Sequence, residues 1–157
     1  MTDNWVKALG IDYGKVRIGL AVSDDLGMLA HPLKTIPGNG ETDPAELIAQ
    51  VVNERGIKDL VIGMPYHSDG RESTISKEVS VFITKLKEKL GDNFPIHEVD
   101  ELMTTKTARE KLRQAGRKQR ETKGILDQAA AAEILQDWLN RRADSAFPEI
   151  DLYPDED

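Results

Sequence analysis

The chain has 157 residues, of which 39% are hydrophobic and 31% charged, and it contains no cysteine. This length suits one domain with a single core, and the composition is typical of a globular protein. Disulfides and thiolate metal sites are excluded, no apolar run approaches the roughly 18 residues of a membrane span, and the amino terminus lacks the pattern of a secretory signal, so we expect a cytoplasmic protein.

The charge is unevenly distributed along the sequence. A net charge of −7 disfavours a polyanionic partner at first sight, because phosphate binding depends on Lys and Arg. Eight basic and two acidic residues lie between Lys106 and Lys123, however, so this stretch carries +6 and the rest of the chain −13. Six acidic residues and no basic one follow from Asp144 onward. We therefore predict a folded domain over residues 1–142, an acidic tail over 143–157, and a basic stretch that either binds nucleic acid or is ordinary solvated surface.

The amino-terminal half predicts a hairpin, a helix and a buried strand. Two apolar runs at 6–11 and 18–22 are joined by a short link in which Gly14 supplies the turn. Asp43 and Pro44 predict the start of a helix over 44–55, which Gly56 ends. A brief strand at 60–62 is closed by Gly63, and a polar loop is expected over 66–72.

The carboxyl-terminal half predicts three helices and one strand. Ser73 can cap a helix whose apolar stripe runs from Ile75 to Leu90 with a 3.6-residue period. A strand follows at 94–99, and Thr104 can cap a helix that reaches residue 115 with its basic residues outward. A basic loop over 116–124 then leads to a last helix over 125–141. These elements predict an α/β fold in which a mixed sheet is flanked by helices.

Acidic residues stand where loops carry function in such a fold. Asp12 ends the first strand, and Glu101 and Asp100 follow the fourth. Asp127 lies at the head of the stripe that continues with Ala131, Ile134 and Trp138, so it faces the core. Without His or Cys nearby, such carboxylates suit hard cations such as Mg²⁺ or Mn²⁺. Taken singly, Asp12 could be a turn residue and Asp127 a helix-dipole partner.

Two such cations, about 3.5–4 Å apart, can activate a water and stabilise the leaving oxygen in an attack at phosphorus. Basic residues of the stretch described above would then hold the phosphate groups. Lys123 stands four residues before Asp127, close enough to contact the scissile phosphate. The residues therefore predict a metal-dependent phosphodiesterase.

Four blocks of the sequence together resemble the YqgF/RuvX family of nucleases, which have a ribonuclease-H-like fold. They are GIDYGKVRIGLAVSD at 10–24, VIGMP at 61–65, VDELMTT at 99–105 and KGILDQAAAAEILQ at 123–136. The blocks come in the order of the family and span the chain to about residue 139. GIDYG alone would be weak, because actin-like ATPases have similar phosphate loops.

The resemblance implies a nuclease that acts on the 5′ end of the small-subunit ribosomal RNA precursor (pre-16S rRNA), with relatives that are considered Holliday-junction resolvases. It assigns the catalytic and metal-binding acids to Asp12, Glu101 and Asp127. The predicted substrate-binding residues are those that the resemblance places beside these acids, together with two from the basic stretch: Arg17, Thr104, Thr105, Lys123, Arg117 and Lys118.

One position departs from the family pattern, which reads Asp-Glu-Arg-Leu-Thr-Thr. Leu102 and Met103 replace Arg-Leu here, so the basic side chain beside the catalytic Glu is missing. This affects substrate affinity or specificity more than metal binding. Strand parity also leaves Glu98 and Asp100 as rivals of Glu101, since they lie on the opposite face unless the strand has ended.

Other functions stay open on sequence alone. The substrate could be RNA or branched DNA, because recognition of a duplex by shape leaves little base-specific signature. An actin-like ATP-binding protein would need a second domain that 157 residues hardly allow. A non-catalytic nucleic-acid-binding factor would bind with a steep salt dependence and cut nothing. A homodimer is compatible with the sequence but not required by it.

Overall fold

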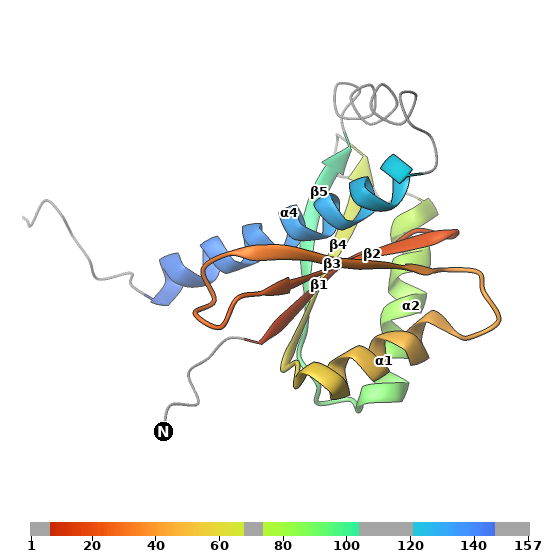
Figure 1. Cartoon of the computed structure of the whole chain (residues 1–157), viewed down its shortest axis with the longest axis horizontal. Coiled ribbons are helices and arrows are strands. Elements are labelled where there is room, and N and C mark those ends of the chain that lie inside the picture. The colour runs from red at the N-terminus through yellow and green to blue at the C-terminus, as the bar shows by residue number, and fades with distance from the viewer. Residues whose placement is uncertain (1–6, 68–73, 104–120, 147–157) are drawn as a thin grey trace, which may run out of the picture.

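The computed structural model describes residues 7–67, 74–103 and 121–146. Within these ranges it contains five strands and three helices (Figure 1). Their bounds are β1 Ala8–Asp12, β2 Arg17–Ser23, β3 Ala30–Pro37, α1 Pro44–Arg55, β4 Asp59–His67, α2 Thr74–Leu90, β5 Ile96–Met103 and α4 Glu121–Ala146. The strands form one sheet in the order β3-β2-β1-β4-β5.

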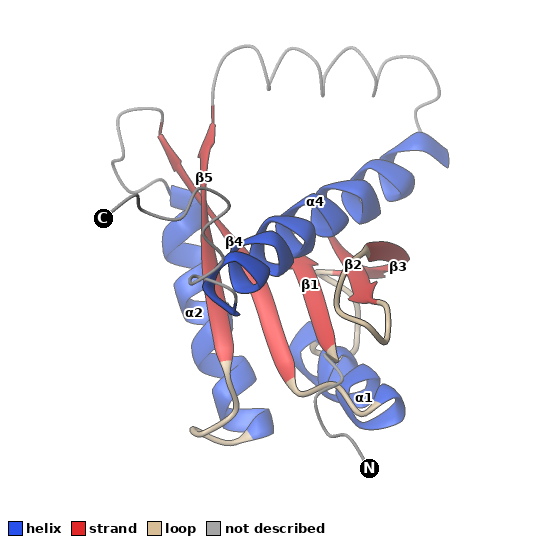
Figure 2. Ribbon diagram, turned by 90° about the vertical axis from the view of Figure 1, so that its left-hand side faces the viewer, coloured by secondary structure: helices blue, strands red, loops and turns tan. Residues whose placement is uncertain are grey.

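The sheet is mixed. The pairs β1–β2 and β2–β3 are antiparallel, whereas β1–β4 and β4–β5 are parallel. Parallel neighbours need a crossover, and α1 and α2 provide two of these on the same face of the sheet, while α4 crosses the other face (Figure 2). This is the α/β architecture predicted from the sequence.

The two helical layers cover two separate groups of buried side chains. Alternate residues of β1 point to opposite faces, so Leu9 and Ile11 pack with α1 and α2 while Ala8 packs with α4. The α1 and α2 side contains mainly large aliphatic residues, whereas the buried strand residues on the α4 side are the smaller Ala8, Ala21, Val61 and Val99. The catalytic acids predicted above lie on the α4 side.

The predicted hairpin and first helix are confirmed. The helix has the predicted bounds of 44–55, with the Asp43 carboxylate accepting a hydrogen bond from the backbone N–H of Ala45 at 3.0 Å. Gly56 ends the helix in the left-handed conformation, with φ of 66°. The stripe of the second helix is also buried, except that Ile75 is 40% exposed and Leu90 is partly buried.

Strand β3 was not predicted. Its sequence has no regular alternation of apolar and polar residues, and it contains Pro32 between Ala30 and Leu33. Proline is tolerated in a strand at the edge of a sheet, where one side of the backbone needs no partner, and β3 is such an edge. A strand paired with only one neighbour has a weaker alternation of apolar and polar residues. The sequence pattern therefore did not predict β3.

Several predicted boundaries were wrong. Strand β4 continues through residues 66 and 67, which were expected to be a loop, and β5 begins and ends later than predicted. Helix α4 begins at Glu121 inside the expected basic loop, and it continues to Ala146, beyond the predicted helix end at 141. The division between a domain over 1–142 and an acidic tail over 143–157 stays a prediction. The helix predicted at 104–115, its Thr104 cap and the cap at Ser73 lie outside the described residues. None of the helices in the described ranges has the length and hydrophobicity of a membrane span.

Candidate nuclease site

Helix α4 rests directly on the backbone of the sheet because the strands beneath it carry glycines. A Cβ atom at Gly10 would lie 2.7 Å from the Ala131 carbonyl oxygen, and one at Gly63 would lie 2.6 Å from Cδ1 of Ile134. At Gly19, a Cβ would overlap the carbonyl group and Cβ of Asp127. The missing side chains therefore bring the first turns of α4 against β2 and seat Asp127 above Gly19.

The sheet register places Asp12 beside this seat. Asp12 of β1 pairs with Gly19 of β2, and its alternation with Ala8 and Gly10 puts it on the α4 face. On its other side, the parallel register pairs Ile11 with Ile62, so that the next step brings Asp12 beside Gly63 of β4. Asp12 is half-buried.

Glu101 reaches the same place from β5. One of its carboxylate oxygens, Oε2, lies 3.2 Å from the position that a Cβ of Gly63 would occupy. Gly63 thus separates Asp12 on one neighbouring strand from Glu101 on the other, and its lack of a side chain leaves room for both carboxylates. Asp12 and Glu101 each have further polar or electrostatic interactions in the structure.

Strand parity separates Glu101 from its two rivals. Because β5 runs without interruption to Met103, alternation holds through Glu101. Val99 is buried beneath α4, and Glu101 shares its face, whereas Glu98 and Asp100 point to the other face and are exposed. The geometry therefore favours Glu101 as the carboxylate that accompanies Asp12.

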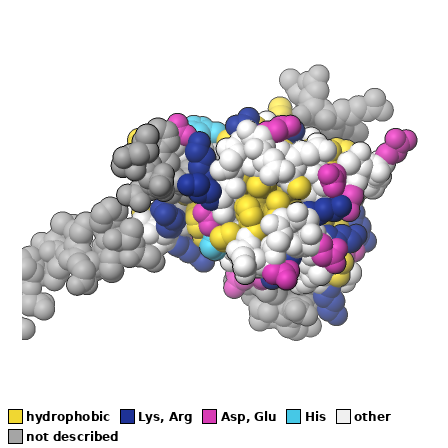
Figure 3. All heavy atoms as spheres, turned by 90° about the horizontal axis from the view of Figure 1, so that it is seen from below, with side chains coloured by type: hydrophobic (Ala, Val, Ile, Leu, Met, Phe, Trp, Pro, Cys, Tyr) yellow, Lys and Arg dark blue, Asp and Glu magenta, His cyan; other side chains and the backbone are white. Residues whose placement is uncertain are grey.

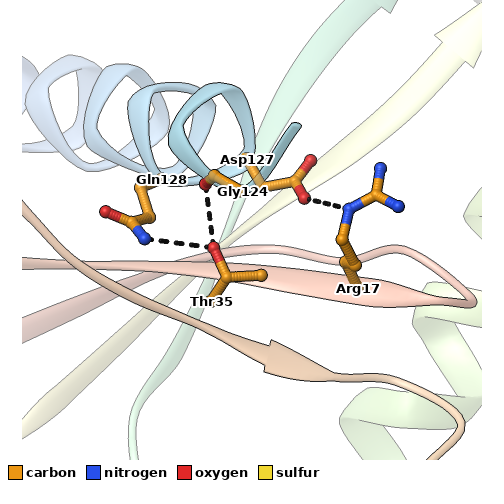
Figure 4. A network of polar contacts seen from close by, with 5 residues as sticks. All are labelled: Arg17, Thr35, Gly124, Asp127 and Gln128. Carbon is orange, nitrogen blue, oxygen red and sulfur yellow. Dashed lines mark hydrogen bonds and ion pairs between the residues drawn. The ribbon is translucent and has the colours of Figure 1, made fainter. Parts of the chain in front are cut away.

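Asp127 is paired with Arg17. The guanidinium Nε of Arg17 donates to Oδ2 of Asp127 at 2.7 Å, and the two side chains are 40% and 21% exposed (Figure 4). Arg17 begins β2 on the same face as Gly19, so it lies next to the seat of Asp127. The pair supplies the counter-charge that a partly buried carboxylate needs.

A second polar contact holds the same turn of α4 from the opposite side. The Thr35 hydroxyl of β3 donates to the Gly124 carbonyl oxygen at 2.8 Å and accepts from Nε2 of Gln128 at 3.2 Å (Figure 4). Neither Thr35 nor Gln128 was predicted from the sequence. Thr35 lies in β3, the strand that the sequence did not predict. Gln128 is a polar helix residue whose only distinguishing feature is its contact with Thr35, which the sequence alone does not show.

The loop after Asp12 contacts α2, which lies on the other face of the sheet. The Tyr13 ring packs against that of Phe82 of α2 in a tilted arrangement, with centroids 4.9 Å apart, and the Lys15 ammonium lies 3.0 Å from a Glu78 carboxylate oxygen. Burial raises the pKa of the Tyr13 hydroxyl, and the Glu78 carboxylate raises it further. The hydrogen bond to Glu78 also raises the pKa of Lys15. Tyr13 is therefore neutral and Lys15 charged near pH 7.

The donor set suits a hard divalent cation in kind, since it consists of carboxylate oxygens. Among residues 7–67, 74–103 and 121–146, however, no three Asp, Glu or His side chains are gathered closely enough to hold a metal ion. Asp12 and Glu101 converge at Gly63, while Asp127 is turned toward Arg17. A cation at this place is thus compatible with the residues, and a third carboxylate ligand requires Asp127 to leave Arg17.

The other predicted substrate-binding residues are only partly placed. The backbone of Lys123 lies in the first turn of α4, close in sequence to Gly124 and Asp127. Thr104, Thr105, Arg117 and Lys118 lie outside the described residues. The homodimer stays a prediction that no described contact tests.

The far side of the molecule has a different character. Figure 3 shows the side on which α1 lies, where acidic and basic side chains are interspersed around a small group of hydrophobic ones. A surface of mixed sign offers a nucleic acid no continuous run of cations. Within the described residues, the converging carboxylates lie on the opposite face of the sheet, under α4.

The fold defines the class of the protein. A mixed five-stranded sheet in this order, with helices on both faces, is a ribonuclease-H-like fold, as predicted. The solved structure of T. thermophilus RuvC in complex with a Holliday junction substrate matches it with a TM-score of 0.55 and 15% sequence identity. The match covers 88% of this chain and 96% of that one. At this identity it establishes the fold alone.

The chain belongs to the RuvX family. Residues 6–141 match the family described as RuvX, Holliday junction resolvase. A protein of Picosynechococcus sp. named "Putative pre-16S rRNA nuclease" is 40% identical over 143 residues, which cover 91% of this chain and 98% of that protein. One of the same name from Mycobacteroides abscessus is 39% identical over 137 residues, covering 87% and 82%. The family resemblance seen in the four sequence blocks is confirmed.

Proposed function

We propose that the protein is a cytoplasmic endonuclease that depends on Mg²⁺ or Mn²⁺ and hydrolyses phosphodiester bonds at the 5′ end of pre-16S rRNA. The observation that carries the proposal is the convergence of Asp12 and Glu101 at Gly63, with Asp127 seated above the adjacent Gly19. The names of the relatives support the substrate.

Asp12, Glu101 and Asp127 are the residues that would hold the cations. When bound, Mg²⁺ or Mn²⁺ would polarise the phosphate and lower the pKa of a water molecule so that it can attack phosphorus. The glycines beneath these acids have no side chains that would fill the space between the carboxylates. Helix α4 packs against this face of the sheet, and the acids remain partly exposed.

Arg17 has two roles in this proposal. Before substrate binds, it neutralises Asp127 through the 2.7 Å contact between Nε and Oδ2. A guanidinium has five N–H donors, of which this contact uses one. The half-exposed Arg17 can therefore also bind a phosphate oxygen of the substrate, and Lys123 adds a second cation from the first turn of α4.

A second candidate is the resolution of branched DNA. It is favoured by the description of the family as a Holliday junction resolvase. Both candidates use the same carboxylates, so a comparison of substrates decides between them.

The test is cleavage of a pre-16S rRNA fragment and of a four-way DNA junction, each with Mg²⁺, Mn²⁺ or EDTA. We expect cleavage of the RNA that requires metal and falls at least about a hundredfold in Asp12→Asn, Glu101→Gln and Asp127→Asn. The matched control is Glu98→Gln, because Glu98 lies on the same strand but points to the opposite face of the sheet, where its side chain is exposed. It should cut like the native chain.

Each other outcome has a definite meaning. Cleavage of the junction alone would replace the ribosomal role with junction resolution. Binding of either substrate without cutting, with affinity that falls steeply with salt, would make the protein a non-catalytic factor. Loss of cutting in Glu98→Gln rather than Glu101→Gln would move the site to the other face of β5.

A further inference from the structure

One row of residues crosses three strands at the level of Asp127. Asp12 of β1 pairs with Gly19 of β2, and Gly19 pairs with Thr35 of β3. Residues paired across neighbouring strands share a face of the sheet. Asp127 sits above Gly19 in the middle of this row, so Asp12 lies on one side of its seat and Thr35 on the other.

Thr35 forms hydrogen bonds with residues of α4 that come before and after Asp127 in the sequence. Its hydroxyl donates to the carbonyl of Gly124, three residues before Asp127, and accepts from the side chain of Gln128, the residue after it. A hydroxyl can donate one hydrogen bond and accept others, so the two contacts are compatible. Figure 4 shows these contacts on one side of the helix turn and Arg17 on the other.

The residue of the sheet directly beneath this turn is Gly19, which has no side chain to fix the lateral position of the helix. Gly19 lets α4 approach closely, but glycine offers no group that would stop the helix from sliding along the sheet. The hydrogen bonds at Thr35 tie the backbone of this turn and the Gln128 side chain to the sheet. Arg17 binds the Asp127 carboxylate itself and would release it to a cation, whereas Thr35 binds the helix and not the carboxylate.

We propose that Thr35 is a positioning residue, which holds the first turns of α4 so that the Asp127 carboxylate meets Asp12 and Glu101 in the reactive arrangement. Gln128 acts through Thr35. The inference rests on the proposed function and adds to it a residue that touches neither substrate nor cation. A displacement of a catalytic group by about 1 Å can lower a rate about a hundredfold.

The chain offers a matched control for this role. Gln136 also ties α4 to β3, with Oε1 accepting from the Ala30 N–H at 2.9 Å and Nε2 donating to the Met28 carbonyl at 2.8 Å. It lies nine residues beyond Asp127, toward the other end of the helix. Loss of either tie weakens the docking of α4, but only loss of the Thr35 tie frees the turn that carries Asp127.

The experiment compares Thr35→Val, Thr35→Ser, Gln128→Leu and Gln136→Leu in steady-state cleavage of the pre-16S rRNA fragment, with Tm measured for each. We expect Thr35→Val to lower kcat about 10- to 100-fold with KM changed less than about twofold. Thr35→Ser keeps the hydroxyl and should recover most of kcat. Gln136→Leu should lower Tm as much as Thr35→Val while keeping native kcat.

The role of Gln128 gives a second variant that keeps Thr35 in place. Gln128→Leu should lower kcat less than Thr35→Val, and the double variant should be no slower than Thr35→Val alone. Thr84→Val removes a hydroxyl that donates to the Ser80 carbonyl on the exposed side of α2, and it should change neither kcat nor KM.

The inference is overturned if the native chain cuts the RNA and Thr35→Val keeps native kcat, or if Gln136→Leu lowers kcat as much as Thr35→Val does. The second result would mean that any weakening of α4 docking impairs cleavage. If the native chain cuts neither RNA nor junction, the proposed function itself fails and the inference falls with it. The native control thus tells the two failures apart.

Discussion

The two faces of the sheet are built from different residues. Toward α1 and α2, neighbouring strands present large aliphatic side chains such as Leu9, Ile11 and Leu20, all fully buried. Toward α4, the same strands present Gly10, Gly19 and the carboxylate of Asp12. Large side chains supply most of the burial that stabilises a fold. The strands bury less side-chain volume on the α4 face. The backbone of α4 and Asp127 can therefore lie directly on the sheet.

The largest effect is expected on the aliphatic face. Leu20→Ala leaves a cavity among residues that are fully buried, and such substitutions lower the free energy of unfolding by about 2–5 kcal/mol. Urea denaturation measures the loss. Since Leu20 points away from Asp12 and Asp127, kcat of the folded fraction should stay native. A loss of kcat in fully folded protein would contradict the division of the two faces.

A substitution of Gly19, the residue next to Leu20, should affect cleavage more than stability. In Gly19→Ala the new Cβ overlaps the backbone of Asp127, so α4 must move, at about 1–3 kcal/mol of stability. Cleavage should fall by more than the loss of folded protein explains, because Asp127 is displaced. Unfolding and cleavage are measured on the same samples.

The control for Gly19 is Gly56→Ala, where a Cβ would have no neighbour within 4 Å but φ is +66°. It should lose about 1 kcal/mol through backbone strain alone and cut normally. Equal cleavage by the two alanine variants would show that α4 does not need its close seat.

A smaller change in stability is expected from Arg17→Met. The ion pair with Asp127 is partly exposed, so its loss should alter the free energy of unfolding by less than about 1 kcal/mol. Removal of the competing cation should tighten Mn²⁺ binding about fivefold, measured by titration calorimetry. Arg141→Met breaks the exposed pair with Asp137 on α4 and is the control. Weaker Mn²⁺ binding in Arg17→Met would contradict the competition.

The smallest effect is expected in the turn between β2 and β3. Burial raises the pKa of the Asp24 carboxyl, but the backbone N–H groups of Met28, Leu29 and Gly27 together lower it below its ordinary value. A lowered pKa in the folded state stabilises the protein above the unfolded pKa of about 3.9. This stabilisation is lost as the pH falls through the folded value.

Asp24→Asn should therefore lower Tm by less than about 2 °C at pH 7, and the difference from the native chain should shrink as the pH falls below about 3.9. Thermal denaturation followed by circular dichroism at several pH values measures it. Asp25→Asn, at an exposed residue 3.7 Å from Lys7, is the control. A difference that persists undiminished at low pH would rule out the charge as its cause.

The sequence predicted the elements whose pattern is local. Helix α1 has both a cap and a terminating glycine, and its bounds were predicted correctly from Asp43, Pro44 and Gly56. Edge strand β3 lacked such signals, because its residues are held by one neighbour and by α4. The start of α4 at Glu121 was missed for a similar reason, since its first turn has no apolar stripe.

The candidate site divides in the same way. Asp12 and Asp127 could be predicted, one from the end of a strand and the other from its place at the head of a buried stripe. The choice of Glu101 over Glu98 depended on how far β5 continues, which the sequence left open. Thr35 could not be found, because its role depends on the register of β3 with Gly19, a contact between distant parts of the chain.

The ion pair between Arg17 and Asp127 joins residues 110 positions apart. A ribosome adds about 5–20 residues per second, so roughly 5–20 s pass between the synthesis of the two. During this interval the nascent chain has its first strand but lacks the helix that completes the site. A chain that stops short of α4 lacks Asp127 and therefore cannot form the proposed site.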